Sequence, residues 1–219
     1  MDLYTKKGSL LFVSCALVSM LIYFAGCSSP AEPKEPSKLP LKTTYESYFP
    51  IGAAVSAGEY GYDSFDRYSH TILSEFNSLV AENCMKPGVI QPTEGEFTWD
   101  PADKIAKYAR EHTMKLRGHV LVWHNQTGEW MFTNSGTAAD KKAFSKAKME
   151  AHINAVVDRY KADVYCWDVV NEAIKDDWDP SEWKSVHREN SPWYKAYGDG
   201  SYIVDAFDMA KAADPDAEL

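Results

Sequence analysis

Apolar residues follow two alternating patterns along the chain: short continuous runs, and longer stretches in which they recur every three or four positions. The short runs predict buried strands, and the longer stretches predict amphipathic helices. The predicted strands are residues 49–55, 77–83, 115–123 and 163–172. The predicted helices that follow them are residues 63–77, 100–114, 137–160 and 201–215. Repeated strand–helix units are typical of a parallel sheet, so we expect an α/β protein.

Local signals refine two of these assignments. Asp100 suits the N-cap of the second helix, and Pro101 suits its first helical position. After the last helix, the residues Ala-Glu-Leu at 217–219 continue the alternation, and they predict the start of a fifth strand.

Polar residues cluster directly after three of the strands, at Glu82-Asn83, at 119–124 and at Asn171-Glu172. Two parallel architectures are possible, a doubly wound open sheet and a (β/α)8 TIM barrel. No Gly-rich dinucleotide turn follows the first strand, which weakens the first option. In a barrel the three clusters meet at the carboxyl end of the strands, where active sites lie. A full barrel takes about 250 residues and contains eight βα units. The chain offers four predicted units and the start of a fifth strand, so we expect the first half of a barrel.

The N-terminal part of the chain differs in composition from the rest. Residues 1–26 combine two lysines, an apolar run and small residues, which predicts a secretory signal peptide. Cys27 follows as in a bacterial lipobox, so we expect a lipidated first residue that anchors an exported protein at the cell surface or in the periplasm. The alternative is an uncleaved membrane anchor, but the run is short for a span. Residues 27–44 are proline-rich and predict a tether, which leaves residues 45–219 as the folded domain.

Charge and cysteine content narrow the possible ligands. The formal net charge of −9 argues against nucleic acid and is compatible with a neutral ligand such as a sugar. The 7 Trp and 13 Tyr residues offer flat surfaces for sugar rings, although most of them are expected in the core. Cys84 and Cys166 lie near separate strand ends and are predicted to stay unpaired. His119 and His124 have no third ligand nearby, so neither a metal nor another cofactor is expected.

Three motifs occur in order on the second, third and fourth predicted strands. They are AENCMKP (81–87), RGHVLVWHNQT (117–127) and WDVVNEA (167–173). Together they resemble the motifs of glycoside hydrolase family 10, the β-1,4-xylanases, over the whole predicted domain. The resemblance implies a TIM barrel and retaining hydrolysis of xylan by two glutamates. Cys84 and Pro87 depart from the Glu and Trp that are common in the family, which is expected to affect substrate choice only.

The resemblance also implies roles for individual residues. Glu172 matches the proton donor, and Asn171 matches the residue that bonds the sugar 2-hydroxyl at the cleavage point. Both can reach the cleft only if the strand ends or bends there, because side chains alternate along a strand. The donor must stay protonated near neutral pH, for which we expect burial and a neighbouring carboxylate. The other expected substrate-binding residues are Glu82, Asn83, Lys86, His119 and Trp123. His124 and Gln126 are expected to support the site, and Asp168 to accept a structural hydrogen bond.

The family's nucleophile is a second glutamate near the end of strand seven, which would follow Leu219. We therefore expect an endo-1,4-β-xylanase represented by its N-terminal part, inactive on xylan alone and monomeric when full length. One alternative is a non-catalytic glycan-binding surface lipoprotein, and another is a related barrel glycosidase that acts on β-glucan. The sequence leaves open internal or terminal cleavage, the fine substrate specificity and any downstream carbohydrate-binding modules.

Overall fold

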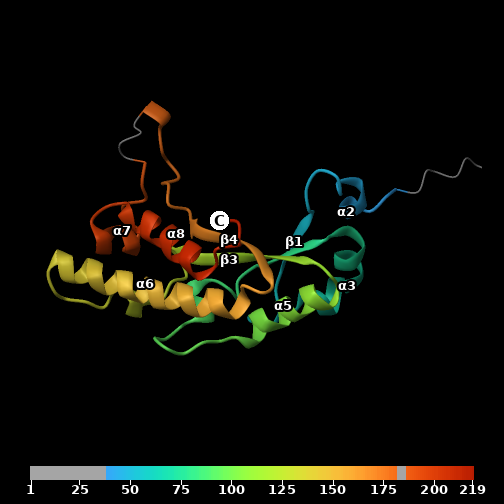
Figure 1. Cartoon of the computed structure of the whole chain (residues 1–219), viewed down its shortest axis with the longest axis horizontal. Coiled ribbons are helices and arrows are strands. Elements are labelled where there is room, and N and C mark those ends of the chain that lie inside the picture. Colours follow the sequence, from blue (N-terminus) through green and yellow to red (C-terminus); the bar gives the residue numbers. More distant parts are fainter. Residues whose placement is uncertain (1–37, 182–185) are drawn as a thin grey trace, which may run out of the picture. The chain divides into compact units, whose positions relative to one another are not determined.

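A parallel sheet of four strands lies at the centre of the computed structural model, which describes residues 38–181 and 186–219 (Figure 1). The strands are β1 (Gly52–Val55), β2 (Ser78–Ala81), β3 (Lys115–Trp123) and β4 (Val164–Asn171). They are hydrogen-bonded in the order β1-β2-β3-β4, and each pair is parallel. A strand order that follows the chain is that of a (β/α)8 barrel, whereas a doubly wound sheet reverses its order at a switch point. The observed order therefore favours the barrel.

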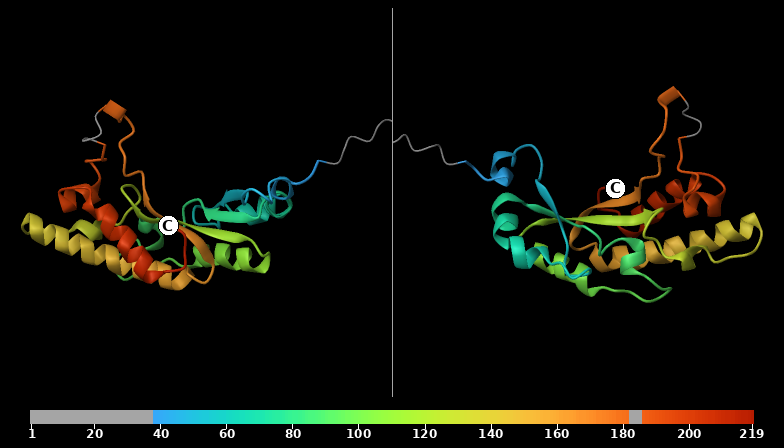
Figure 2. Two further views of the ribbon diagram at one scale, coloured as in Figure 1. Left: turned by 45° about the horizontal axis from the view of Figure 1, so that its top comes forward. Right: turned by 180° about the vertical axis from the view of Figure 1, so that it is seen from behind.

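Helices connect the strands, and α5 and α6 lie along the same face of the sheet (Figures 1 and 2). The helices are α2 (Leu41–Thr44), α3 (Ser64–Glu75), α4 (Pro87–Ile90), α5 (Asp100–Glu111), the 3₁₀ turn η1 (Glu129–Phe132), α6 (Ala138–Tyr160), α7 (Pro192–Tyr197) and α8 (Ser201–Ala213). The four predicted strands and the four predicted helices are confirmed, and β3 has the predicted bounds. The short elements α4, η1 and α7 lie in connections, where they are too short for a periodic signal.

Two helices show how local sequence sets a helix start. Thr137 precedes α6 and forms a capping box with Asp140: the Asp140 amide donates to Thr137 Oγ1 at 3.3 Å, and the Thr137 amide donates to Asp140 Oδ2 at 2.9 Å. At α5 the N-cap is Trp99, and Asp100 is the first helical residue. The predicted cap at Asp100 was therefore one residue late, and its carboxylate instead lies in the first turn, where the helix dipole favours it.

The last residues of the predicted tether are folded. Pro40 is the N-cap of the helical turn α2, and the Leu41 amide donates to the Glu75 carboxylate of α3 at 2.8 Å. The chain is therefore helical from Leu41 instead of extended up to Tyr45, where the folded domain is predicted to begin. The predicted signal peptide, Cys27 and most of the tether lie outside the described residues.

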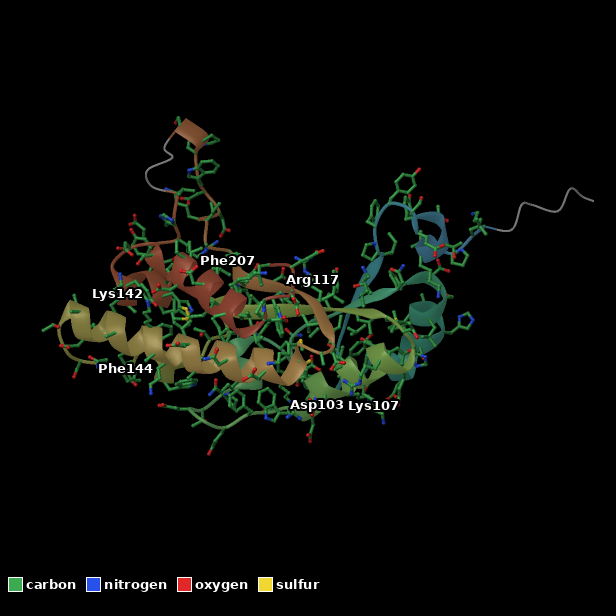
Figure 3. The ribbon with its side chains drawn as sticks, in the orientation of Figure 1. Asp103, Lys107, Arg117, Lys142, Phe144 and Phe207 are labelled. Atoms are coloured by element: carbon green, nitrogen blue, oxygen red, sulfur yellow. The ribbon has the colours of Figure 1, made fainter. Side chains whose placement is uncertain are left out.

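The core fills the space between the sheet and its helices, where side chains from both layers meet (Figure 3). Fully buried members include Leu79, Ile105, Leu116, Leu121, Ile153 and Val157. One strand position has no room for a side chain: a Cβ on Gly118 would lie 2.2 Å from Cε3 of the Trp167 ring on β4. Glycine at this position lets the indole pack directly on the β3 backbone.

The predicted start of a fifth strand is present as one pairing beside β4. Glu218 forms a parallel bridge with Cys166. The Trp167 amide donates to Glu218 O at 2.9 Å, and the Glu218 amide donates to Tyr165 O at 3.2 Å. The chain therefore adds its next extended segment in the sequential order of a barrel.

Three further findings concern residues 38–181 and 186–219. Cys84 and Cys166 are buried and free, which confirms the prediction that they are unpaired. None of the helices in these ranges has the length and apolar character needed to cross a bilayer. Within the same ranges, no three His, Cys, Asp or Glu side chains converge in a group that could hold a metal ion.

Candidate active site

The carboxyl ends of β3 and β4 lie side by side, because Trp123 and Asn171 are paired in register. β4 ends at Asn171, and the next residue, Glu172, adopts a left-handed backbone conformation with φ of +52°. This conformation is uncommon for residues other than glycine, and such residues cluster at functional sites. It interrupts the alternation of the strand, so two consecutive side chains need not point to opposite faces. The prediction that the strand ends at the Asn171-Glu172 pair is confirmed.

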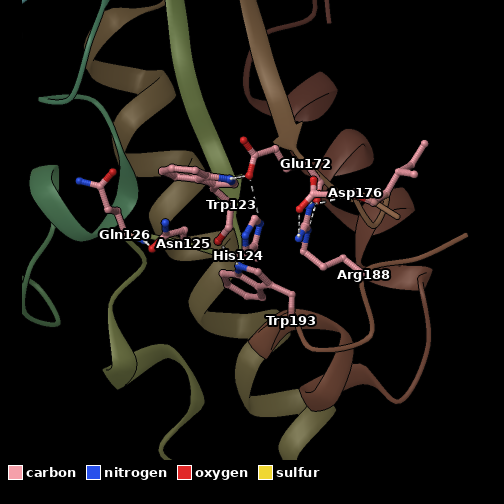
Figure 4. A network of polar contacts seen from close by, with 9 residues as sticks. Trp123, His124, Asn125, Gln126, Glu172, Asp176, Arg188 and Trp193 are labelled. Carbon is pink, nitrogen blue, oxygen red and sulfur yellow. Dashed lines mark hydrogen bonds and ion pairs between the residues drawn. The ribbon is translucent and has the colours of Figure 1, made fainter. Parts of the chain in front are cut away.

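The Glu172 carboxylate is held at one oxygen (Figure 4). Trp123 Nε1 donates to Glu172 Oε2 at 2.9 Å, and His124 Nδ1 lies 3.7 Å from the same oxygen. The Glu172 side chain is nevertheless 48% exposed. In the half of the barrel that this chain forms, the Trp123 and His124 rings lie against one carboxylate oxygen, so the expected burial of the donor stays a prediction for the complete barrel.

A row of predicted sugar-binding residues leads from Trp123 towards β2. Lys86 Nζ lies 5.0 Å above the centre of the Trp123 ring, and it donates to Asn83 Oδ1 at 2.8 Å. The preceding residue, Glu82, accepts a hydrogen bond from Ser56 Oγ at 2.9 Å. Lys86 therefore contacts both Asn83 and Trp123, and the Trp123 indole joins this group to the candidate proton donor.

His119 belongs to a second polar group, formed across β3 and β4. Its Nδ1 lies 2.9 Å from Asp168 Oδ2, and the Arg117 guanidinium forms a bidentate pair with the same carboxylate. Burial alone would raise the pKa of Asp168, but the bonds from His119 and Arg117 outweigh it and hold that pKa at about 2. An ionised Asp168 makes Nδ1 the protonated nitrogen of His119, which leaves Nε2 to accept or donate elsewhere. Among the described residues no hydrogen bond joins this group to Glu172.

Of the two predicted supporting residues, His124 lies beside Glu172 and Gln126 does not. His124 packs edge-on to Trp123, and its pKa is lowered by burial and by the nearby charge of Arg188, while the Glu172 charge acts in the opposite direction. His124 therefore stays neutral beside the donor. Gln126 Nε2 reaches Tyr60 Oη at 3.4 Å, so it lies towards the β1–α3 loop and not at Glu172.

Sequence reasoning missed three residues of this region. Ser56 orients Glu82; Arg188 donates to the Glu172 carbonyl at 2.9 Å; and Trp193 Nε1 donates to the Trp123 carbonyl at 3.0 Å. The Pro192-Trp193 pair at the start of α7 is a helix-start signal that could have revealed the third. Ser56 and Arg188 lie in irregular segments with no periodic signal.

The fold and the site together define a β/α-barrel protein whose polar groups gather at the carboxyl ends of parallel strands, where such proteins bind their ligands. Within that class the chain belongs to glycosyl hydrolase family 10, whose family model matches residues 40–219.

Curated relatives are similar over most of this chain. It is 43% identical over 182 residues to "Endo-1,4-beta-xylanase A" of Halalkalibacterium halodurans, covering 78% of this chain and 43% of the relative. It is 41% identical over 186 residues to "Endo-1,4-beta-xylanase/feruloyl esterase" of Xylanibacter ruminicola, covering 82% of this chain and 25% of the relative. The chain therefore spans less than half the length of these relatives.

Solved structures agree with the fold. "A psychrophilic glycoside hydrolase family 10 endo-beta-1,4-xylanase" superposes with a TM-score of 0.70 at 41% identity, covering 82% of this chain and 53% of that one. Xylanase XynB from Paenibacillus barcinonensis gives a TM-score of 0.72 at 38% identity, covering 84% of this chain and 52% of that one. The (β/α)8 assignment is confirmed, with about half of the barrel represented by this chain.

Proposed function

We propose that this chain carries the proton-donor half of a retaining endo-1,4-β-xylanase. The observation that carries the proposal is the position of Glu172 at the end of β4, with one carboxylate oxygen bonded to Trp123. Because Oε2 accepts the indole N–H, Oε1 is the oxygen that delivers the proton. A partly exposed rim position suits this role, since the glycosidic oxygen must come within hydrogen-bond distance of the donor.

The reaction has two steps. In the first, Glu172 gives its proton to the leaving glycosidic oxygen as the C1–O bond breaks, while a second carboxylate forms an ester at C1. In the second, the ionised Glu172 takes a proton from water, whose oxygen bonds to C1 as the ester breaks. Asn171 binds the 2-hydroxyl, a contact that strengthens in the transition state.

The proposed substrate is xylan, a neutral polymer. Amide, ammonium and carboxylate groups at Asn83, Lys86 and Glu82 can bond vicinal hydroxyls, and His119 Nε2 can bond another. The names of several relatives include endo-1,4-β-xylanase, which supports xylan. One relative, 38% identical over 187 residues, is named "Exoglucanase XynX" from Acetivibrio thermocellus, so β-glucan is the second candidate.

The first prediction concerns this activity. The described strands number four, whereas the family's nucleophile lies on the seventh, so we propose that residues 1–219 alone do not hydrolyse xylan and that a complete monomeric enzyme does. Reducing ends released from xylan and from β-glucan, with oligosaccharide products separated by size, test this for both proteins. A mixture of oligosaccharides indicates internal cleavage. Xylan hydrolysis by residues 1–219 would overturn the proposed mechanism, and binding without cleavage by the complete protein would favour a glycan-binding lipoprotein.

The second prediction concerns location. We propose that the protein is exported and held at a membrane by lipid on Cys27, because the preceding residues resemble a bacterial lipobox. Expressed in a bacterial host, the wild-type protein is expected in the membrane fraction, with an acylated N-terminal peptide by mass spectrometry. Cys27→Ser is expected in the soluble exported fraction, because serine at this position cannot carry the lipid that holds the wild-type protein at the membrane. Wild-type protein without acyl groups would contradict the proposal.

A further inference from the structure

The Arg188 side chain is largely buried, with its guanidinium directed at the backbone that follows β4 (Figure 4). Its side chain is 11% exposed. Nε donates to the carbonyl oxygen of Glu172 at 2.9 Å, and Nη2 donates to the carbonyl oxygen of Ile174 at 3.1 Å. We call these two bonds the Arg188 clamp. They fix the 172–173 and 174–175 peptide groups, immediately after the candidate proton donor.

Backbone pairing brings the Arg188 segment to this position. The Arg188 amide donates to Ala173 O at 2.8 Å, and the Lys175 amide donates to Val186 O at 3.1 Å. Ile174 and His187 form an antiparallel bridge between these two bonds. Two short segments thus run side by side, and Arg188 both ends the pairing and reaches back along it to Glu172.

The guanidinium bonds a carboxylate as well as the two carbonyl oxygens. Arg188 also pairs with Asp176, at 2.7 and 3.2 Å. The Asp176 side chain is 88% exposed, and pairs with such an exposed partner contribute little. Hydrogen bonds from a charged donor to the carbonyl oxygens are stronger than neutral ones, and they hold the guanidinium in one orientation.

The clamp acts at a residue with an uncommon backbone conformation. Glu172 has a φ of +52°, and the direction of its side chain depends on that conformation. Trp123 holds the carboxylate at Oε2, and the clamp holds the carbonyl of the same residue. We propose that Arg188 is a positioning residue that aims the proton donor through the backbone of Glu172. The inference rests on the proposed function, in which Glu172 is that donor.

The third prediction tests this role with two substrates in the complete enzyme. Proton donation is needed to expel a sugar but not to expel 2,4-dinitrophenolate. 2,4-Dinitrophenol is a much stronger acid than a sugar hydroxyl, so its anion leaves without a proton. Arg188→Ala is expected to lower kcat/KM on xylohexaose by about 100-fold, because small misplacement of a catalytic group has effects of this size. On 2,4-dinitrophenyl β-xylobioside, kcat/KM is expected to stay within about threefold of wild type. Equal losses on both substrates, or no loss on xylohexaose, would overturn the proposal.

Two further variants separate the clamp from charge and from general damage. Asp176→Asn removes the exposed ion pair but keeps both carbonyl bonds, so it is expected to behave as wild type on both substrates. Arg188→Lys keeps the charge, but its ammonium group cannot bond both carbonyl oxygens as the planar guanidinium does. Its kcat/KM is therefore expected to fall on xylohexaose and not on 2,4-dinitrophenyl β-xylobioside. Full activity of Arg188→Lys would show that charge alone suffices, and the positioning role would be wrong.

A measurement independent of catalysis completes the test. In hydrogen exchange of the complete protein, Arg188→Ala is expected to expose the Lys175 amide while the β4 amides keep wild-type protection. If Lys175 keeps its protection, the clamp does not hold this backbone and the inference fails. Absence of wild-type hydrolysis would instead reject the proposed function, since the exchange result does not depend on activity.

Discussion

Glu172→Gln is expected to lower kcat/KM of the complete enzyme on xylan by about 10²–10⁴-fold, the range typical of a lost general acid. The amide has the same size, and its carbonyl oxygen can still accept the Trp123 indole N–H seen at 2.9 Å. Glutamine cannot transfer a proton to the leaving oxygen, so the loss reports chemistry and not structure. Initial rates on xylan and on 2,4-dinitrophenyl β-xylobioside measure it, and the loss in kcat/KM on the activated substrate is expected to be much smaller.

Matched variants sharpen this experiment. Glu111→Gln changes an exposed carboxylate at the far end of α5, which contacts Lys107 only, and it is expected to leave activity unchanged. Glu172→Ala opens space beside Trp123. On 2,4-dinitrophenyl β-xylobioside, added azide is expected to restore turnover of this variant and to yield β-xylobiosyl azide, because azide attacks C1 of the ester intermediate without a general base. Hydrolysis by Glu172→Gln within threefold of wild type would mean that another residue is the donor.

Trp193→Ala is expected to destabilise the protein by about 3–5 kcal/mol, the usual cost of removing a large aromatic side chain from a core. The Trp193 side chain is 1% exposed and packs edge-on against Phe132, with ring centres 4.6 Å apart. For a barrel of this size the melting temperature is expected to fall by roughly 6–20 °C, measured by circular dichroism or calorimetry of the complete protein. A fall of less than about 3 °C would show that this aromatic contact is not part of the stable core.

Trp193→Phe is the matched control for packing. It keeps most of the ring contact with Phe132 but removes the N–H that donates to the Trp123 carbonyl at 3.0 Å. Leaving that buried carbonyl without its partner is expected to cost about 1–3 kcal/mol. The difference between the two variants separates ring packing from the hydrogen bond that supports the strand end beneath the site.

Periodic segments of this chain were predictable because their burial is periodic. β3 alternates between helix-covered and opposite faces around Gly118, and α6 begins at a strong capping box, so both could be placed from residues close in sequence. The contacts of Asn83 with Lys86 were also predictable in kind, since the two lie three positions apart in one motif.

Other features depend on residues distant in sequence. Arg188 bonds the backbone of Glu172 across 16 positions, and neither neighbourhood signals the other. The burial of Glu172 stays a prediction, because a strand pattern describes the layer of the sheet but not what covers the end of a strand. The helical turn at Leu41–Thr44 is not predictable from proline content, which indicates an extended chain.

The two buried cysteines have a consequence for a protein that we propose is exported. Burial, with a smaller contribution from the Glu59 charge, raises the pKa of the Cys84 thiol to about 12, and burial also raises that of Cys166. Only the thiolate attacks disulfides or reacts readily with oxidants, and the raised pKa keeps Cys84 in the thiol form at neutral pH. Both thiols of the folded protein are therefore expected to stay unreacted in an oxidising compartment. In an unfolded chain both thiols are exposed and can form incorrect disulfides.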